Sequence, residues 1–444
     1  MVPLRVLEIV GFLQNGSEVL YRLFYRLLKV KLMGLIDVLK REFSFITGNY
    51  RILIVSWVLM DIAMEMPVPY YQQYVQALGG TGLGLGIIGF ANFLAMALVA
   101  LPGGFLADKY GRRWLIATMT FGLAFSYILF ALAPTWHFIL IGTIAQSLCL
   151  IYQPALFAMV QDSLPAERRG VGSSLIQMIH GTFNTPGPVV GGLLILLFGL
   201  ISGMRVVYLI TMVMFIAAAV WRLKLKETTI NGEPMRFRYF ISSYPQAVRE
   251  SLSVWKVVPR SMLWLFIVQT MVMFANALAN VINAIYARDQ LHIPQDQWFL
   301  VYIPMLITMV IASFPIGKMV DRIGVKLPMT IGPFVLASAL LLFINGNLFT
   351  IMVSMCLLGL FTLFVMSSAM SLSAALVEPE NRGKVRGCLN FAGYLFTGLG
   401  MLLGNFLYDF VPQLPFYLTI GLTVPMILII VFRINEPKRQ QSTI

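Results

Sequence analysis

Two ten-residue stretches decide the fold of this chain: GFLADKYGRR at residues 104–113 and GKMVDRIGVK at residues 317–326. The second follows the first by 213 residues and repeats its order of glycine, aspartate, glycine and a final basic residue. The same offset joins Pro102 to Pro315, Glu167 to Glu380, Gly170 to Gly383, Gly187 to Gly400 and Gly191 to Gly404. A constant offset over this length predicts two copies of one structural unit.

The chain around these stretches is strongly apolar. Of its 444 residues, 59% are hydrophobic and 11% are charged, whereas soluble domains carry about 25% charged residues. So few charges could not cover a water-facing surface of this size. Composition therefore excludes soluble enzymes, nucleic-acid-binding domains and disordered scaffolds, although the net charge is +13.

Apolar segments of about 20 residues, the length that crosses about 30 Å of hydrocarbon, predict membrane-spanning helices. They are too long for the strands of a membrane barrel. The sequence thus predicts an all-α membrane protein of twelve helices in two six-helix bundles, related by a pseudo-two-fold axis along the membrane normal. The expected helices lie near 52–77, 84–106, 113–133, 137–160, 171–199, 204–223, 260–287, 297–320, 327–345, 349–377, 386–410 and 414–433.

Basic residues fix the expected orientation. With the N-terminus inside, 30 of the 32 Lys and Arg residues fall on the cytoplasmic side, and only Arg205 and Arg288 fall outside. This asymmetry predicts a multi-pass protein of the cell membrane with both termini cytoplasmic. The expected divisions are a basic interfacial segment at 1–50, bundles at 51–224 and 259–435, a linker at 225–258 and a tail at 436–444.

Two of these divisions keep alternatives. The segment 1–50 suits a basic helix on the inner leaflet, and translation could begin at Met1 or Met33. The linker is read as a solvated connection with an interfacial helix, and a regulatory site is the alternative.

No metal or cofactor chemistry is expected. Cys149, Cys356 and Cys388 lie in apolar stretches without metal-ligand spacing, and the three histidines are scattered. No phosphate-binding Gly-rich loop with Lys-Ser/Thr occurs, which argues against an ATPase. We expect no enzyme activity and no resident cofactor, with the proton as coupling ion.

The stretch 104–113 resembles the signature loop of the major facilitator superfamily of secondary transporters, and 317–326 resembles a weaker copy. The resemblance covers residues from about 50 to 435. Glycines permit a tight turn, and Asp108 and Arg112, four residues apart, can pair. The resemblance implies that Asp162 joins them in a latch that favours the outward-open state; the alternative is a merely topogenic basic turn. The expected cytoplasmic gate comprises Gly104, Asp108, Gly111, Arg112, Arg113, Asp162, Gly317, Asp321, Arg322, Gly324 and Lys326.

Intramembrane charges are the candidates for coupling. Asp61 and Glu65 follow Arg51 by 10 and 14 residues, and are thus about 15 and 21 Å deep on one helix face. His180 follows Arg169 and reaches about 16 Å. Because a carboxylate at this depth costs a few kcal/mol, about 2.5–3.5 on insertion scales, we expect the acids to face a central cavity and carry protons. His180 either relays a proton, pairs with an acid or packs through a hydrogen bond; for the acids, the alternative is a structural hydrogen bond.

The fifth expected helix carries Pro186, Gly187, Pro188, Gly191 and Gly192. These residues resemble the end of a motif of the drug/proton antiporter branch, although Phe183 stands where that motif has a further glycine. We expect this helix to pack closely against the other half and to limit leakage; ordinary small-residue packing is the alternative. The arginine usual in helix four of that branch is missing, since no Arg or Lys lies between Arg113 and Arg168.

Neutral polar residues complete the expected site, with interhelical hydrogen bonding as the alternative for each. The cavity-lining candidates are Gln146, Tyr152, Gln153, Asn276, Asn280, Asn283, Asn390 and Tyr394. The sequence as a whole predicts a secondary transporter that works by alternating access, with proton-coupled efflux of lipophilic or cationic small molecules as its function. Alternatives are an importer of a metabolite or lipid and, from another class, a nontransporting receptor. Expected partners are a small-molecule substrate and the bilayer, not nucleic acid, and we expect a monomer.

Overall fold

The computed structural model describes residues 45–164, 186–228, 253–280, 282–293, 298–378 and 382–436, with single positions at 175–176, 179–180, 182–183, 245 and 249. The segment 1–44, most of the linker and the tail 437–444 lie outside the described residues, and so do the expectations for them. Every regular element in the described part is helical. The prediction of an all-α membrane protein is therefore confirmed.

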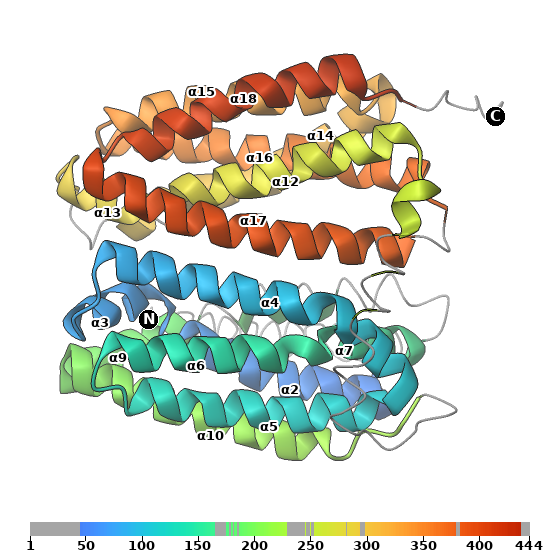
Figure 1. Cartoon of the computed structure of the whole chain (residues 1–444). Helices are drawn as coiled ribbons and strands as arrows, with labels where there is room; N and C mark the ends of the chain where they lie inside the picture. Colours follow the sequence, from blue (N-terminus) through green and yellow to red (C-terminus); the bar gives the residue numbers. More distant parts are fainter. Residues whose placement is uncertain are drawn as a thin grey trace, which may run out of the picture.

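The first half of the chain forms one group of helices (Figure 1). Its elements are α2 (Gly48–Glu65), η1 (Val68–Tyr70), α3 (Tyr71–Ala77), α4 (Gly82–Tyr110), α5 (Arg112–Ala131), α6 (Trp136–Cys149), η2 (Leu150–Tyr152), α7 (Gln153–Asp162), α9 (Pro186–Phe198) and α10 (Leu200–Arg222).

The second half forms the other group (Figure 1). Its elements are η4 (Val254–Lys256), α12 (Arg260–Asn280), α13 (Asn283–Asp289), α14 (Trp298–Ile323), α15 (Lys326–Ile344), α16 (Leu348–Leu376), α17 (Arg382–Phe410) and α18 (Leu414–Arg433).

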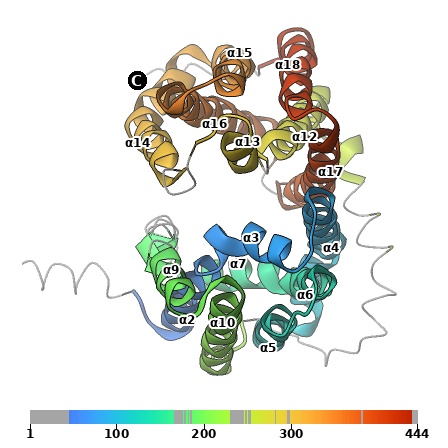
Figure 2. The same ribbon diagram turned by 90° about the vertical axis from the view of Figure 1, so that its left-hand side faces the viewer.

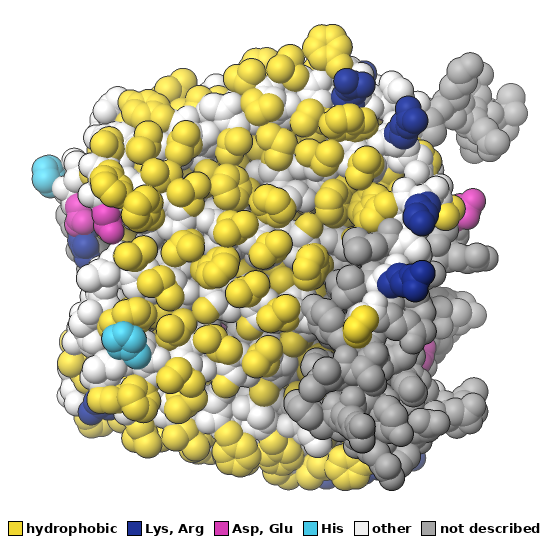
Figure 3. All heavy atoms as spheres, in the orientation of Figure 1, with side chains coloured by type: hydrophobic (Ala, Val, Ile, Leu, Met, Phe, Trp, Pro, Cys, Tyr) yellow, Lys and Arg dark blue, Asp and Glu magenta, His cyan; other side chains and the backbone are white. Residues whose placement is uncertain are grey.

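Length and composition support a membrane-spanning protein. Eleven helical segments in the described residues are long and apolar enough to cross a bilayer, and α9 is a shorter apolar helix. Hydrophobic side chains cover the surface shown in Figure 3, while most Lys and Arg side chains visible there lie at one end. We call the end of the molecule that carries Arg112, Lys326 and Arg433 the basic end.

Three of the expected spans are interrupted. The first continues from α2 through η1 into α3, where Pro67 and Pro69 remove backbone N–H donors. The fourth divides into α6, η2 and α7, with Pro154 at the start of α7. The seventh divides into α12 and α13. Interrupted helices expose backbone groups only where protein or water surrounds them.

The duplication extends to single contacts in the two cores. The Tyr74 hydroxyl donates to the carbonyl of Phe130 at 2.9 Å in the first half. The Tyr286 hydroxyl donates to the carbonyl of Ile344 at 2.8 Å in the second. Each bond joins the helix after the interruption to the end of the third span, so the repeat in sequence is a repeat in packing.

The halves meet where α4 lies beside α17 (Figures 1 and 2). Glycines allow this approach: a Cβ added at Gly398 would lie 3.2 Å from the Phe90 carbonyl oxygen. A Cβ at Gly86 would lie 3.1 Å from Cβ of Asn405. On the other side of the molecule, α9 packs on α10 and α2, and α14 packs on α16.

Candidate functional site

Asp61 and His180 come together in the first half. Asp61, on α2, is 8% exposed, and its Oδ2 lies 2.8 Å from Nδ1 of His180. The indole of Trp57 lies edge-on to the imidazole, with ring centroids 5.8 Å apart, and closes one side of the pair. A carboxylate this buried needs a partner, and the imidazole can supply either a proton or a positive charge.

Glu65 lies one turn beyond Asp61 on α2 and is half-buried. Its stem touches the fifth span, because a Cβ added at Gly187 would lie 2.8 Å from Cβ of Glu65. Asp61, Glu65 and His180 thus lie where α2 packs against the fifth span. The two carboxylates can exchange a proton for a cation at this place.

Glycines on α9 bring its backbone onto α2. A Cβ at Gly187 would lie 2.6 Å from the Ile62 carbonyl oxygen, and a Cβ at Gly191 would overlap the Met66 carbonyl. A Cβ at Gly192 would lie 2.7 Å from the Tyr70 hydroxyl. The expectation that these glycines pack against the other half is therefore wrong. They fix the helix that follows His180 on the helix that carries Asp61.

The second half repeats this contact without the charges. A Cβ at Gly400 of α17 would lie 2.7 Å from the Phe274 carbonyl oxygen, and one at Gly404 would overlap the Leu278 carbonyl. Both partners belong to α12, the counterpart of α2. The backbone contact is repeated, but at the same offset Asp61, Glu65 and His180 correspond to Phe274, Leu278 and Gly393, none of which is ionisable.

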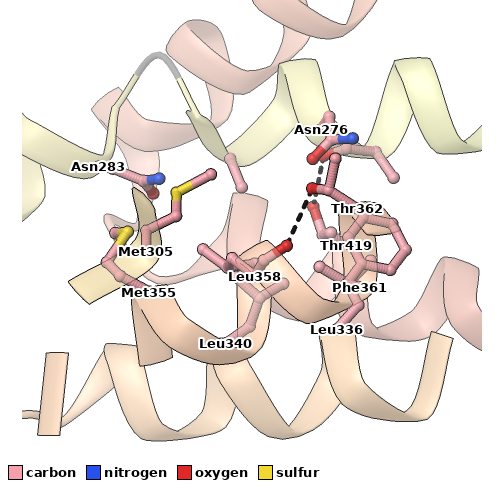
Figure 4. Close-up of a pocket in the computed structure, with 12 residues that line it drawn as sticks. Asn276, Asn283, Met305, Leu336, Leu340, Met355, Leu358, Phe361, Thr362 and Thr419 are labelled. Carbon is pink, nitrogen blue, oxygen red and sulfur yellow. Dashed lines mark hydrogen bonds between the residues drawn. The ribbon is translucent and has the colours of Figure 1, made fainter. Parts of the chain in front are cut away.

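The neutral candidates occupy different environments. Asn276 is exposed and Asn283 is 4% exposed, and both line a cavity in the second half (Figure 4). Tyr394 lies at the seam, with its ring 6.2 Å from that of Phe93 in the other half. Gln146, Gln153 and Asn390 are half-buried. The side chain of Asn280 lies outside the described part.

Arg222 is a functional candidate that the sequence analysis assigned to the cytoplasmic surface. It is 0% exposed. Its guanidinium donates to the hydroxyls of Ser56 at 2.9 Å and Thr120 at 2.8 Å. A long side chain at the end of α10 can turn back into the bundle, so that the first half contains a positive charge although helix four carries none.

Tyr152 lies beneath this charge. It is 3% exposed, its hydroxyl accepts from Arg222 at 3.4 Å, and the guanidinium carbon lies 5.5 Å from the ring centroid. Tyr152 was expected to line the central cavity. Its place in the core corrects this, because hydrogen bonding and a cation–π contact to Arg222 hold it there.

The predicted gate contains an ion pair between Arg112 and Asp162. Gly111 just before it has φ +90, a conformation that favours glycine. Arg113 donates to the Leu223 carbonyl at 2.9 Å. Asp162, which the family resemblance added to this cluster, is thus one partner of Arg112, and the Thr228 hydroxyl accepts from the same guanidinium at 3.3 Å. The backbone of Gly104 and Asp108 belongs to α4, and their side-chain environments lie outside the described part.

Glu227 adds a carboxylate that the sequence analysis missed. It accepts the backbone N–H groups of Arg112 and Arg113, each at 3.0 Å, at the start of α5. A helix N-terminus favours a negative charge because its first N–H groups lack helical partners. The segment after α10 is also held to α2, since the Asn49 amide bonds both backbone groups of Lys226 at 2.7 and 2.8 Å.

The second half has the same device. Gly324 has φ +105, and the N–H of Lys326 at the start of α15 donates to Glu436. Glu436 follows α18 as Glu227 follows α10. Gly317 has open space around it, Arg322 lies in the last turn of α14, and the Asp321 side chain lies outside the described part. The only sequence signal was a glutamate just after each half's last helix.

The two arginines predicted to lie outside, Arg205 and Arg288, have local partners. Arg205 donates to the Ala133 carbonyl at 3.2 Å. Arg288 Nε donates to Oδ1 of Asp289 at 2.6 Å, and this hydrogen bond raises the pKa of Arg288. In the described residues no three His, Cys, Asp or Glu side chains group as metal ligands.

Similarity to known proteins agrees with this architecture. A family model described as Major Facilitator Superfamily matches residues 53–306 and 265–443. The multidrug resistance protein MdtG of Escherichia fergusonii is 28% identical over 295 residues, which cover 62% of this chain and 67% of the relative. An MFS-type transporter of Methanocaldococcus jannaschii is 23% identical over 357 residues, which cover 78% of this chain and 86% of the relative.

Solved structures share the fold. The human organic anion transporter MFSD10 aligns with a TM-score of 0.63 at 18% identity, over 86% of this chain and 98% of that one. The nucleoside transporter NupG aligns with a TM-score of 0.63 at 16% identity, over 87% and 98%.

Proposed function

Because this chain belongs to the major facilitator superfamily and is a multi-pass membrane transporter rather than an enzyme, we propose that it exports lipophilic, cationic small molecules in exchange for protons. The observation that carries the proposal is the contact between the buried Asp61 carboxylate and the His180 imidazole, at 2.8 Å. A buried carboxylate can bind a proton or a cation. Once protonated it is neutral and attracts a cation only weakly, so that binding of one favours release of the other.

The surroundings of the pair suit this exchange. Glu65 supplies a second carboxylate one turn away, and Trp57 offers an aromatic edge beside the imidazole. A lipophilic cation would find a negative charge within apolar walls. The proton is the proposed coupling ion, and no resident cofactor takes part.

The relatives support export more than any other direction. The MdtG relatives from several bacteria are named multidrug resistance proteins. The organic anion and nucleoside transporters share only the fold with this chain, and therefore carry no weight for its substrate. The prolines and glycines at 186–192 resemble the antiporter motif, and we therefore assign the chain to the drug/proton antiporter branch of the superfamily.

Alternating access would proceed by rocking of the two halves against each other, which would expose Asp61 and Glu65 to each side of the membrane in turn. We propose that the protein lies in the cell membrane and that its basic end and both termini face the cytoplasm. There the Arg112–Asp162 pair would hold the cytoplasmic side closed, and opening the halves on that side would break it. Each half would rock as a rigid unit, and the protein would work as a monomer.

Flux measurements with a pH-sensitive dye test the function. In proteoliposomes with an imposed proton gradient, protons should flow down that gradient through the purified protein, and ethidium should move in the opposite direction. Asp61→Asn should abolish this coupling, while Asp289→Asn, which changes an exposed acid at the opposite end, should leave it intact. Movement of ethidium together with protons would instead indicate an importer, and binding without any flux would indicate a receptor.

A further inference from the structure

The fourth span of the first half is broken, whereas its counterpart in the second half is continuous. In the first half, α6, η2 and α7 follow one another, and Pro154 stands at the start of α7 (Figure 1). In the second half, α16 runs without interruption from Leu348 to Leu376, across the positions that correspond to this break at the offset of 213 residues. A proline that lacks its N–H explains the break, but the direction in which α7 continues depends on what holds its start.

The guanidinium of Arg222 holds this break. It contacts three hydroxyls from three other elements, those of Ser56 on α2, Thr120 on α5 and Tyr152 in η2. The Ser56 and Thr120 hydroxyls donate their own protons to carbonyls of their helices, at 2.8 and 2.6 Å. Each of these two oxygens is therefore left as an acceptor for the guanidinium. All four residues are at most 3% exposed.

Stability of the core alone does not account for this arginine. Among the described residues no acid forms an ion pair with Arg222, and its Nη2 has no hydrogen-bond partner there. A buried charge within a membrane-spanning bundle is costly, and such a residue by default indicates a function. Even a buried ion pair adds little stability over well-packed apolar side chains, and Arg222 is without one.

The second half lacks this cluster. At the offset of 213 residues, Arg222, Thr120 and Tyr152 correspond to Asn435, Pro333 and Val365. The second half thus has neither the guanidinium nor these two hydroxyls, and its fourth span is unbroken. The buried arginine and the break therefore occur together, in the half that contains the Arg112–Asp162 pair.

The helix α7 connects the break to the gate. It begins directly after Tyr152 and ends at Asp162, the partner of Arg112. Its ten residues form about 15 Å of helix. The helix α5 lies beside both η2 and α7, since Arg112 is its first residue and Thr120 follows eight residues later. Asp162 can therefore meet Arg112 only when the start of α7 is held at the matching place along α5.

We propose that Arg222 is a positioning residue for the cytoplasmic gate. Its guanidinium holds the break in the fourth span against α2 and α5, and α7 transmits this position to Asp162. Without Arg222, α7 can turn about its start, so that the Arg112–Asp162 pair forms less often and the cytoplasmic side opens more readily. The proposal rests on the gate in the proposed function and adds a residue that lies one short helix away from the gate pair.

Cysteine labelling without substrate or proton gradient tests this role. The full-length protein carries Asn276→Cys after replacement of Cys149, Cys356 and Cys388, and an impermeant maleimide is added to inside-out membrane vesicles. Arg222→Met keeps a long side chain without its charge and should raise the labelling rate at least about fivefold, the lower end of typical couplings between two sites. Arg222→Lys, which keeps the charge and a donor, should raise it less.

A second substitution separates positioning of the gate from a general change in packing. Asp162→Asn already breaks the gate pair, so that adding Arg222→Met to it should raise labelling no further, whereas an effect on packing elsewhere would add to it. Arg205→Met is the matched control and should leave labelling unchanged. Arg205 lies on the same helix, near the end opposite to Arg222, and donates to the Ala133 carbonyl.

Tyr152→Leu provides an independent variant, and elution as a single species on size exclusion selects folded proteins. It removes the contact at the break, while Arg222 keeps Ser56 and Thr120, and should also raise labelling only when Asp162 is present. The role of Arg222 is overturned if neither folded variant raises labelling, or if their effects are the same with and without Asp162→Asn.

Ethidium flux separates this result from the proposed function. If labelling follows the expectation while a proton gradient drives no ethidium movement in the wild type, the proposed export is contradicted and the positioning role stands. If proton-driven ethidium movement is observed but Arg222→Met and the wild type label at the same rate, export stands and the positioning role is contradicted.

Discussion

Nδ1 of His180 lies 2.8 Å from Oδ2 of Asp61 and connects the fifth span of the first half to the first. The glycines of α9 hold the same two spans together at Ile62, next to Asp61, and at Met66. Geometry and charge therefore depend on one helix contact, because a shift of α9 on α2 would separate the pair.

Removing the imidazole should uncouple transport. His180→Ala removes the imidazole that lies 2.8 Å from the Asp61 carboxylate, and a buried carboxylate without a partner is unfavourable. Proton-driven ethidium efflux should therefore fall at least about tenfold, while His180→Gln, which keeps hydrogen-bonding groups, should fall less. The control is His137→Ala, since His137 is exposed and stacks on Trp136. Equal activity of His180→Ala and the wild type would contradict a role for the pair.

Breaking the gate pair should change which side of the membrane is open. Asp162→Asn removes the negative partner of Arg112, so that a cysteine placed at Asn276 should react faster with an impermeant maleimide from the cytoplasmic side. Cys149, Cys356 and Cys388 are replaced beforehand. Exchanging the charges in Arg112→Asp with Asp162→Arg should restore slow labelling. Glu378→Gln, an exposed acid in the loop before α17, is the control; unchanged labelling in Asp162→Asn would show that the pair is no latch.

The two glutamate caps should contribute to stability. Glu227→Gln weakens two charge-assisted hydrogen bonds at the start of α5, and Glu436→Gln weakens the corresponding contact at α15. Loss of an N-terminal cap costs about 0.5–2 kcal/mol, which should lower the temperature of thermal unfolding in detergent. The substitution at Glu227 should have the larger effect. Unfolding temperatures equal to that of the wild type would mean that these carboxylates do not stabilise the helix starts.

The glycine contact should tolerate no side chain. Gly191→Ala places a methyl group on the Met66 carbonyl and should push α9 from α2, with loss of proton-driven efflux. Gly404→Ala does the same between α17 and α12. Gly421→Ala is the control, because a Cβ there meets nothing within 4 Å. Wild-type efflux and yield for Gly191→Ala would show that the close contact is unnecessary.

The helix positions and the duplication could be predicted because they depend on local apolar length and on a repeat. The contacts of Tyr74 and Tyr286 show how far the repeat extends into the cores. The sequence left the role of His180 open between proton relay, pairing with an acid and packing. Spacing along two helices does not fix how each helix is rotated about its axis, and so cannot show that His180 faces Asp61.

Other parts of the site depend on tertiary packing. Arg222 ends an apolar helix, and the sequence pattern is the same whether such an arginine lies at the membrane surface or turns into the bundle. Its hydrogen bonds to Ser56 and Thr120 show that it turns inward. Gly187 and Gly191 predict a close helix contact, but their sequence does not identify the helix that they contact. Glu227 and Glu436 lie in short segments whose role depends on where the chain runs after each last helix.

Proton release on substrate binding tests the central claim most directly. Purified protein in lightly buffered detergent receives ethidium, and a pH dye records the medium. If a cation displaces the proton shared by Asp61 and His180, the wild type should release protons in proportion to bound ethidium, and Asp61→Asn should release none while remaining folded. Binding of ethidium to the wild type without proton release, or equal release from Asp61→Asn, would contradict exchange at this carboxylate.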